Sequence, residues 1–293
     1  MHRDHPVLPF LLTFAGVGML SLMDAFMKGA SLAIGAYSAA VWRAALACLI
    51  IAPFWLLLGG RWPARNVLKL HLLRGTVSAF MALSFFYALT KLPIAEAIAI
   101  SFIAPLIALY LAALLLGEQI RREAIFASIL GFGGTIVIIG GKIGREPPSE
   151  DVWLGLGAIL FSAMLYAYNF VVIRQQSQVA KPAEIATFHG GVAALVLGLG
   201  APWFLEWPTT AAMIDLGWAA LLTVGGAMAL AWAYARAEAQ ALVPIEYSGF
   251  LWASLFGWLF FAEQVTLPTI AGTLLIVAGC WIAARAPTEQ STI

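Results

Sequence analysis

Charged side chains are scarce in this chain of 293 residues, of which only 11% are Asp, Glu, Lys or Arg. A soluble domain carries about 25% of such residues to cover its surface with polar groups. The apolar fraction is correspondingly high at 62%, and the mean hydropathy is +0.92. This composition excludes a soluble enzyme, a nucleic-acid-binding protein and a disordered scaffold, and it predicts a protein of the lipid bilayer.

Other scarcities narrow the class further. The formal net charge is +1 and no basic run exceeds two residues, so neither nucleic acid nor an anionic surface is an implied partner. The two cysteines, Cys48 and Cys280, lie in apolar runs without metal-binding or redox spacing, and we interpret both as helix packing residues. The sequence has no Walker motif, no metal-binding His/Glu spacing and no nucleophile elbow. We therefore expect no metal, no cofactor, no ATP hydrolysis and no enzymatic activity.

Long apolar runs fill the chain between short polar breaks. A helix that crosses the hydrocarbon layer of ~30 Å needs about 20 apolar residues. Period-2 alternation, which is typical of a membrane barrel, is absent from these runs. The sequence therefore predicts an all-α integral membrane protein with ten transmembrane helices, at 7–28, 34–58, 68–90, 94–116, 123–140, 152–173, 184–204, 211–234, 241–261 and 266–285.

The distribution of Lys and Arg predicts how these helices are oriented. With the N-terminus inside, eleven of the sixteen basic residues fall on the inner side, Arg74 among them, and four fall on the outer side. Arg43, the remaining one, lies within a helix. Because basic loops stay in the cytoplasm, we predict a multi-pass protein of the bacterial inner membrane with both termini cytoplasmic.

The chain also resembles itself at a distance of 145 residues. This shift aligns 117–119 with 262–264, where each segment closes an apolar helix with Glu-Gln. It also aligns two stripes of small residues, the kind of surface that lets membrane helices approach closely: Ala104, Ala108 and Ala112 with Gly249, Ala253 and Gly257. We interpret residues 1–145 and 146–293 as two five-helix repeats.

An odd number of helices in each repeat has a topological consequence. The second repeat must enter the membrane in the opposite orientation to the first. Inverted repeats of this kind are the build of secondary transporters, in which two similar halves exchange inward-facing and outward-facing states around a central site.

A family resemblance points the same way. Ten helices in two halves, the helix ending Leu-Leu-Leu-Gly-Glu at 114–118 and the Gly-rich helix at 131–141 resemble the drug/metabolite transporter superfamily, EamA-type, over nearly the whole chain. Ala262 departs mildly from the Gly of the repeated ending. Within the superfamily, the many aromatic residues and the pattern of Asp24, Lys28, Trp42 and Arg43 are most similar to bacterial exporters of aromatic amino acids and paraquat. The resemblance implies a small-molecule substrate, moved outward by alternating access.

Ionisable groups within the predicted helices are the first candidates for a site, because a charge in the hydrocarbon costs about 2.5–3.5 kcal/mol on insertion scales. Arg43 and Asp24 are placed to form a pair, which serves either to close the outer end or to handle a carboxylate or proton. Asp24 has an alternative partner in Lys28, four residues on. His189 aligns with Arg43 at a shift of 146, and it is either hydrogen-bonded to a backbone carbonyl or exposed to protons and substrate.

The acidic residues near the ends of the predicted helices can have several roles. Glu246 either snorkels to the cytoplasmic surface or points inward. We interpret Glu118 and Glu263 as residues that cap helix ends, and Glu96 and Lys91 as solvated groups of the outer rim. Pro105, near the middle of the fourth predicted helix, predicts a kink there and a position beside the central cavity.

Aromatic and polar residues that share a face with these charges complete the candidate site. Their rings suit a flat apolar or cationic solute, although core packing is the alternative for each ring. Tyr168 and Asn169 align roughly with Asp24 and are candidates for the opposite gate. The candidate substrate-binding residues are Asp24, Trp42, Arg43, Ser84, Tyr87, Ser101, Phe102, Tyr168, Asn169, His189, Trp232, Glu246, Tyr247 and Trp252.

The sequence thus predicts an exporter of amino acids, aromatic and other neutral ones, and of aromatic cations. A permease for phosphorylated sugars is the alternative, but it demands several convergent basic groups and Arg43 stands alone. A membrane-embedded enzyme would need paired carboxylates or a His/Asp cluster, and a passive channel is a third alternative. The driving ion, the resting conformation and the choice between monomer and homodimer are left open.

Overall fold

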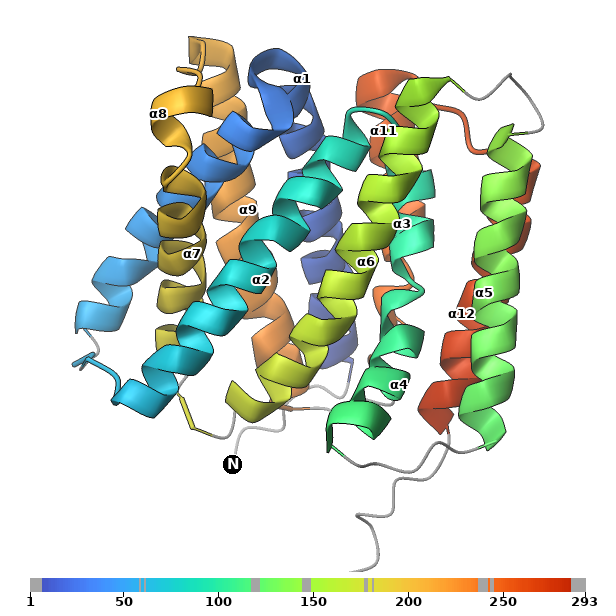
Figure 1. Cartoon of the computed structure of the whole chain (residues 1–293), viewed down its shortest axis with the longest axis horizontal. Helices are drawn as coiled ribbons and strands as arrows, with labels where there is room; N and C mark the ends of the chain where they lie inside the picture. The colour runs from blue at the N-terminus through green and yellow to red at the C-terminus, as the bar shows by residue number, and fades with distance from the viewer. Residues whose placement is uncertain are drawn as a thin grey trace, which may run out of the picture.

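The computed structural model describes residues 7–57, 59–60, 62–116, 122–143, 149–176, 179–180, 182–236, 242 and 245–285, and it is helical throughout, with no strand among these residues. The helices lie next to one another across the longest axis of the molecule, some of them tilted, as α2 is (Figure 1). They are α1 (Leu8–Leu57), α2 (Arg65–Leu89), α3 (Ile94–Ser101), α4 (Ala104–Leu116), α5 (Arg122–Ile143), α6 (Glu150–Gln176), α7 (Pro182–Gly198), α8 (Ala201–Phe204), α9 (Thr210–Tyr234), α11 (Gly249–Phe261) and α12 (Leu267–Arg285).

Five helical stretches are long and apolar enough to cross a membrane: Leu8–Leu57, Arg65–Leu89, Ile94–Leu115, Glu150–Ile173 and Thr210–Tyr234. Shorter apolar helical stretches lie within α5, α7, α11 and α12. The start of α1 and the end of α12 lie at the same end of the bundle (Figure 1). The all-helical membrane architecture predicted from composition is therefore confirmed for the described residues.

Helix α1 reverses its direction at Gly35. Its 50 residues would extend about 75 Å as a straight helix, more than twice the hydrocarbon thickness. Gly35 has φ 77° and ψ 147°, a conformation that residues with a Cβ rarely adopt, and Ile34 beside it is also non-helical. The two predicted helices 7–28 and 34–58 are both present, but the turn between them lies at Ile34–Gly35 rather than at 29–33.

The predicted helix 94–116 is interrupted. Phe102 and Ile103 form a turn between α3 and α4, immediately before Ala104-Pro105. Proline disfavours helical geometry in the residue before it and lacks the N–H that would continue the ladder. The Sγ atom of Cys280 on α12 donates a hydrogen bond to the freed carbonyl of Phe102 (3.4 Å). The kink predicted from Pro105 is confirmed, and Cys280 has a bonding role as well as a packing role.

A second turn precedes α11. Tyr247 and Ser248 form this turn, which divides the predicted helix 241–261, because residues 242 and 245–246 before it are helical and α11 begins after it at Gly249. Residues 237–241 and 243–244, which include Pro244, lie outside the described residues, as does Glu118. The two turns meet in space, because the rings of Phe102 and Tyr247 pack edge to face at 5.2 Å.

Two helix pairs are in especially close contact through glycine. A Cβ built on Gly134 of α5 would lie 2.4 Å from the carbonyl oxygen of Gly272 on α12, so the two backbones touch there. Helices α1 and α9 cross in the same way at Gly16 and Gly226. Side by side at the edge of the bundle, α5 and α12 are visible as a separate pair (Figure 1). Such small-residue contacts hold membrane helices together by dispersion forces.

The predicted stripe on α11 is a packed surface. Gly249, Ala253 and Gly257 are the three buried residues of this helix, which packs against α1 and α3. On α4, the equivalent Ala104 is buried against Ala163 of α6. The side chain of Ala112 lies outside the described part of the structure.

We expect Ala253→Leu to destabilise the protein by about 1–3 kcal/mol, because a larger side chain must force α11 away from its neighbours. Ala253 is 0% exposed, whereas Leu251 on the same helix is 65% exposed. Leu251→Ala is therefore the matched control and should have little effect. Thermal melting of both variants in detergent measures the difference, and equal melting temperatures would contradict a packed stripe.

Candidate functional site

The reversal of α1 brings two opposite charges into the interior. Asp24 lies eleven residues before Gly35 and Arg43 lies eight residues after it, so they sit about 16 and 12 Å from the turn on the two arms of α1. The two side chains interact electrostatically and both are half-buried. The guanidinium carbon of Arg43 also lies 5.1 Å from the centre of the Phe86 ring on α2. Asp24 and Arg43 thus interact at a distance, and the salt bridges among the described residues do not include a direct Asp24–Arg43 pair.

Lys28, the alternative partner considered for Asp24, forms a buried ion pair with Glu263. Its Nζ atom also donates a hydrogen bond to the carbonyl of Leu92 (2.7 Å), and Lys28 is only 7% exposed. The other carboxylate oxygen of Glu263 accepts a hydrogen bond from the backbone N–H of Ile94 (2.8 Å). The prediction that Glu263 caps a helix end is correct, and the helix that it caps is α3.

The Lys28–Glu263 pair joins three parts of the chain that are distant in sequence. Lys28 belongs to α1, Ile94 begins α3, and Glu263 follows the end of α11. At Ala262 the chain leaves α11 in a left-handed conformation (φ 54°), which turns Glu263 back toward the helix ends. A carboxylate at the start of α3 also complements the positive end of the helix dipole.

A second polar network links α2, α6 and α7. Arg74 Nη1 donates to Gln176 Oε1 (2.9 Å), and Gln176 Nε2 lies 2.6 Å from His71 Nδ1. His71 Nε2 lies 2.9 Å from Glu184 Oε1. Because arginine can only donate, the amide oxygen of Gln176 must face Arg74 and its NH₂ group must donate to His71. His71 therefore accepts at Nδ1 and donates to Glu184 from Nε2.

Arg74 lies deeper than its sequence position implied. The orientation count placed it on the inner side, but it is the tenth residue of α2, about 13 Å from the helix start. Its Nε atom is buried without a hydrogen-bond partner. The same holds for Arg43 Nε and for His189 Nδ1 on α7. Electrostatic interactions link His189 to both arginines, so Arg43 does not stand alone.

Acidic and phenolic groups gather on the other side of Asp24. The hydroxyl of Tyr234 on α9 donates a hydrogen bond to Glu246 Oε1. Tyr166 on α6 interacts electrostatically with both Glu246 and Asp24. Glu246 is half-buried, which agrees with the inward alternative for this residue. The interior thus holds basic groups on α1, α2 and α7, and its acidic groups, on α1 and before α11, lie near tyrosines of α6 and α9.

Three of the candidate tryptophans are engaged elsewhere. Trp42 donates from Nε1 to the carbonyl of Glu206 (3.1 Å). The ring of Trp232 is covered by Arg236, whose guanidinium carbon lies 4.0 Å from the ring centre. Trp252 fills a notch at Gly18 of α1, where a Cβ would lie 2.9 Å from the indole. These three contacts are a hydrogen bond, a cation–π contact and a packing contact, and each holds its ring within the protein.

The remaining candidates are scattered over α2, α3 and α6. Ser84 and Tyr87 line a hollow of about 790 Å³ beside the reversal of α1. The Ser84 hydroxyl donates to the carbonyl of Phe80 (2.7 Å). Ser101 likewise donates to Ala97 within α3 (2.9 Å).

On α6, the two candidate residues for the opposite gate differ in burial. Asn169 is buried and accepts a hydrogen bond from Ser78 Oγ of α2 (3.4 Å). Tyr168 is half-buried. Together with Phe102 and Tyr247, which touch, these candidates occupy several levels of the bundle rather than one pocket.

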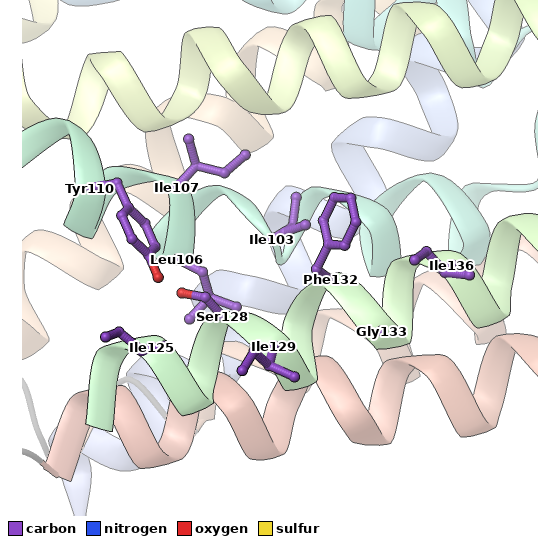
Figure 2. A pocket seen from close by; sticks show the side chains of 10 residues that line it. All are labelled: Ile103, Leu106, Ile107, Tyr110, Ile125, Ser128, Ile129, Phe132, Gly133 and Ile136. Carbon is purple, nitrogen blue, oxygen red and sulfur yellow. The ribbon is translucent and has the colours of Figure 1, made fainter. Parts of the chain in front are cut away.

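A second hollow lies between α4 and α5 (Figure 2). It measures about 530 Å³, and its lining is almost entirely apolar, with Tyr110 and Ser128 as the polar members. Figure 2 shows both hydroxyls near the same end of the groove. Several lining residues are exposed on the outside of the bundle, Phe132 among them (62%). The groove has no charged group that could hold a polar solute.

The outer rim differs from its prediction at one residue. Glu96 is buried, not solvated, because it belongs to the first turn of α3 beneath the Lys28–Glu263 pair. Lys91 donates to Asp151 Oδ1 of α6 (2.6 Å), and this hydrogen bond raises the pKa of the Lys91 ammonium above its usual value. Among the described residues, no group of three or more His, Cys, Asp or Glu side chains is placed to hold a metal ion.

Sequence reasoning missed Arg74, Tyr166, Tyr234 and the network around His71. Of these, Arg74 could have been found from the sequence, since it is the seventh residue of the predicted helix 68–90 and a charge within a membrane helix is costly. The tyrosines carry no such signal, because Tyr is common at both membrane interfaces.

The chain is similar to known transporters over most of its length. The model of the EamA-like transporter family matches residues 8–140 and again residues 153–285. The pseudopaline exporter CntI of Pseudomonas aeruginosa is 31% identical over 271 residues, covering 89% of this chain and 90% of that protein. The riboflavin transporter of Brucella anthropi is 25% identical and covers 81% of this chain and 84% of that protein.

A further transporter and a solved structure are also similar to this chain. The S-adenosylmethionine uptake transporter of Rickettsia prowazekii is 25% identical and covers 88% of this chain and 85% of that protein. One protein crystal structure is similar with a TM-score of 0.64 at 18% identity, covering 94% of this chain and 96% of that chain. At that identity the structural similarity shows the fold alone.

We expect Glu263→Gln to destabilise the protein by about 3–5 kcal/mol, because it removes the carboxylate that pairs with the buried Lys28 ammonium. Asp151→Asn is the matched control. It breaks the exposed Lys91–Asp151 pair, in which Asp151 is 65% exposed, and should cost less than about 1 kcal/mol. Adding Lys28→Met to Glu263→Gln should recover part of the loss. Thermal melting in detergent tests this, and equal losses for Glu263→Gln and Asp151→Asn would contradict a buried pair.

Proposed function

The chain belongs to the EamA-like transporter family, and on that premise we propose that it exports amino acids, aromatic and other neutral ones, and aromatic cations across the inner membrane. The observation that carries the proposal is the interior placement of Asp24 and Arg43 on the two arms of α1. Charged groups inside a membrane bundle are costly and mark the path of a polar substrate. A neutral amino acid has one group of each sign to meet this pair.

One of the similar proteins supports outward transport as the direction. The pseudopaline exporter is named for outward transport, whereas the S-adenosylmethionine transporters are named for uptake. The rings of Phe102 and Tyr247, together at the two helix interruptions, offer a face for an aromatic side chain or cation.

The proposed architecture is ten transmembrane helices in two inverted repeats, 1–145 and 146–293. Two separate matches of the family model, one in each half, support a duplication. The turn at 102–103 and the turn at 247–248 also differ by 145 residues, so each half has an interrupted helix at the same place. Helices that are discontinuous near the middle of the membrane frame the substrate site in transporters of this build.

Alternating access then requires contacts that can open and close. The Lys28–Glu263 pair joins the first half to the second near the proposed outer end. The network of His71, Gln176 and Glu184 joins them near the proposed inner end. Water can replace polar contacts of this kind when one end of the protein opens. The glycine contacts between α5 and α12, in contrast, keep those two helices packed together.

A permease for an anionic metabolite is the second candidate. Arg74 supports it, because two interior arginines and His189 supply more positive charge than Arg43 alone. Asp24 beside Arg43 offsets that charge, which favours a solute without net charge.

We expect purified protein in liposomes to exchange external L-[³H]phenylalanine for internal unlabelled L-phenylalanine in a saturable way. An excess of another neutral amino acid should compete, and Arg65→Gln, at the exposed start of α2, should exchange normally. Exchange of riboflavin, S-adenosylmethionine or a sugar phosphate with no exchange of any amino acid would contradict the proposal and favour the second candidate.

Orientation has its own test in intact cells. In a Cys48→Ala, Cys280→Ser background, which keeps a donor for the carbonyl of Phe102, we expect an impermeant maleimide to label Ser149→Cys. Val179→Cys at the opposite end should be labelled only after permeabilisation, because the Lys and Arg distribution favours that side as cytoplasmic. The reverse labelling pattern would overturn the proposed orientation.

A further inference from the structure

Resting on the proposed function, we propose that Arg43, Arg74 and His189 form the subsite that binds the carboxylate of the transported solute. The three side chains come from α1, α2 and α7, and no sequence pattern groups them. In this subsite Asp24 is the resident counter-ion of Arg43, and the incoming carboxylate takes its place beside the guanidinium.

Backbone contacts of α7 bring the three positions together. Next to Arg74, a Cβ on Gly75 would lie 2.4 Å from the Cβ of Val192, so α2 touches α7 one turn from His189. Next to His189, a Cβ on Gly190 would lie 3.4 Å from the backbone nitrogen of Cys48 on α1. Helix α7 therefore passes directly between the helices that carry the two arginines.

These contacts also fix the heights of the three residues along the bundle. With a rise of 1.5 Å per residue, Arg74 and His189 lie within about 3 Å of each other along the axis, and Arg43 lies about 9 Å from His189 toward the reversal of α1. The Arg43 guanidinium also contacts the Phe86 ring of α2, which lies twelve residues, or about 18 Å along that helix, beyond Arg74. The link between the two arginines is therefore His189, which interacts electrostatically with both. Two long arginine side chains and one amino acid can bridge a gap of this size.

Polar atoms of the proposed subsite lack hydrogen-bond partners. Six buried side-chain atoms have no hydrogen-bond partner in the described part of the chain, and three of them are Arg43 Nε, Arg74 Nε and His189 Nδ1. The two arginine Nε atoms carry a hydrogen in every state, and His189 Nδ1 carries one in the tautomer that is protonated at that atom. A buried N–H without an acceptor costs about 1–3 kcal/mol, so a ligand that supplies acceptors gains that energy back. A carboxylate offers two acceptor oxygens and forms charge-assisted bonds with arginine.

The surrounding groups orient such a ligand. Gln176 holds Arg74 through Nη1 and leaves Nε unused, and Gln176 is itself held by His71 and Glu184. Asp24 and Glu246, which both interact electrostatically with Tyr166, are the acidic groups available to the ammonium of the solute. A zwitterion therefore lies with its carboxylate toward α2 and α7 and its ammonium toward Asp24.

The test compares L-phenylalanine with L-phenylalaninamide, which keeps the ring and the ammonium but has no carboxylate. Both compete for L-[³H]phenylalanine exchange in liposomes, with unmodified protein, Arg74→Gln, Arg74→Lys, Arg43→Gln and the control Arg65→Gln. We expect unmodified protein to prefer the acid by about tenfold or more, since hydrogen bonds to charged groups contribute at that level. Arg74→Gln and Arg43→Gln should each reduce this preference to within about twofold of unity.

The preference of Arg74→Lys for the acid over the amide should lie between those of unmodified protein and Arg74→Gln. The lysine ammonium keeps the positive charge, but it lacks the planar fork with which arginine can bind Gln176 and a carboxylate together. Arg65→Gln should keep the full preference. A variant counts as folded if it elutes as a single species in size-exclusion chromatography and keeps its melting temperature. If Arg74→Gln does not fold, Arg43→Gln tests the proposal.

Two outcomes overturn the proposal in different ways. Equal competition by the acid and the amide in unmodified protein, or an equal loss of both in the arginine variants, overturns the carboxylate subsite while amino-acid export survives. Absence of exchange for every amino acid overturns the subsite together with the proposed function.

Discussion

Every buried charge in this chain needs a partner, and the arrangement of the bundle depends on how these partners are supplied. Lys28 finds Glu263 across more than two hundred residues of sequence, and the same carboxylate caps the start of α3. An isolated ammonium in hydrocarbon would cost several kcal/mol, so this pair restricts how α1, α3 and α11 can be placed. At the other end, the donor-only chemistry of Arg74 sets the orientation of Gln176 and, through it, the tautomer of His71.

Two kinds of contact therefore coexist in the fold. The crossings of α1 with α9 and of α5 with α12 are made by glycine against backbone, and they leave no room for rearrangement. The polar links consist of side chains that water or a solute can replace. A transporter needs both kinds, because rigid units must move against each other around a site whose bonds are exchangeable. The partnerless nitrogen atoms of Arg43, Arg74 and His189 lie where these polar links are incomplete.

The sequence predicted the architecture well because apolar run length and small-residue spacing are direct consequences of the bilayer. The kink before Pro105 and the buried stripe at Ala253 followed from local rules of this kind. The turn of α1 was displaced because Gly35, rather than the polar residues before it, provides the backbone conformation that the reversal requires. The partner of Lys28 could not be predicted, since no local rule connects α1 to the end of α11.

The candidate site was predictable only in part for the same reason. Arg43, Asp24 and His189 are visible as ionisable groups inside apolar runs. Arg74 was counted with the inner-side basic residues although it lies within the predicted helix 68–90, and because α2 begins at Arg65 it is three residues deeper in the helix than that prediction placed it. The contacts of the tryptophans could not be predicted, because the hydrogen bond of Trp42 to Glu206 and the packing of Trp252 against α1 depend on tertiary structure.

The most direct test of the central claim is an experimental structure of the protein in lipid nanodiscs with L-phenylalanine bound. The account predicts density for the amino acid in the interior of the bundle, with its carboxylate about 3 Å from nitrogen atoms of Arg43, Arg74 or His189. Density for the amino acid only in the apolar groove between α4 and α5, or in the hollow beside the reversal of α1, would contradict it.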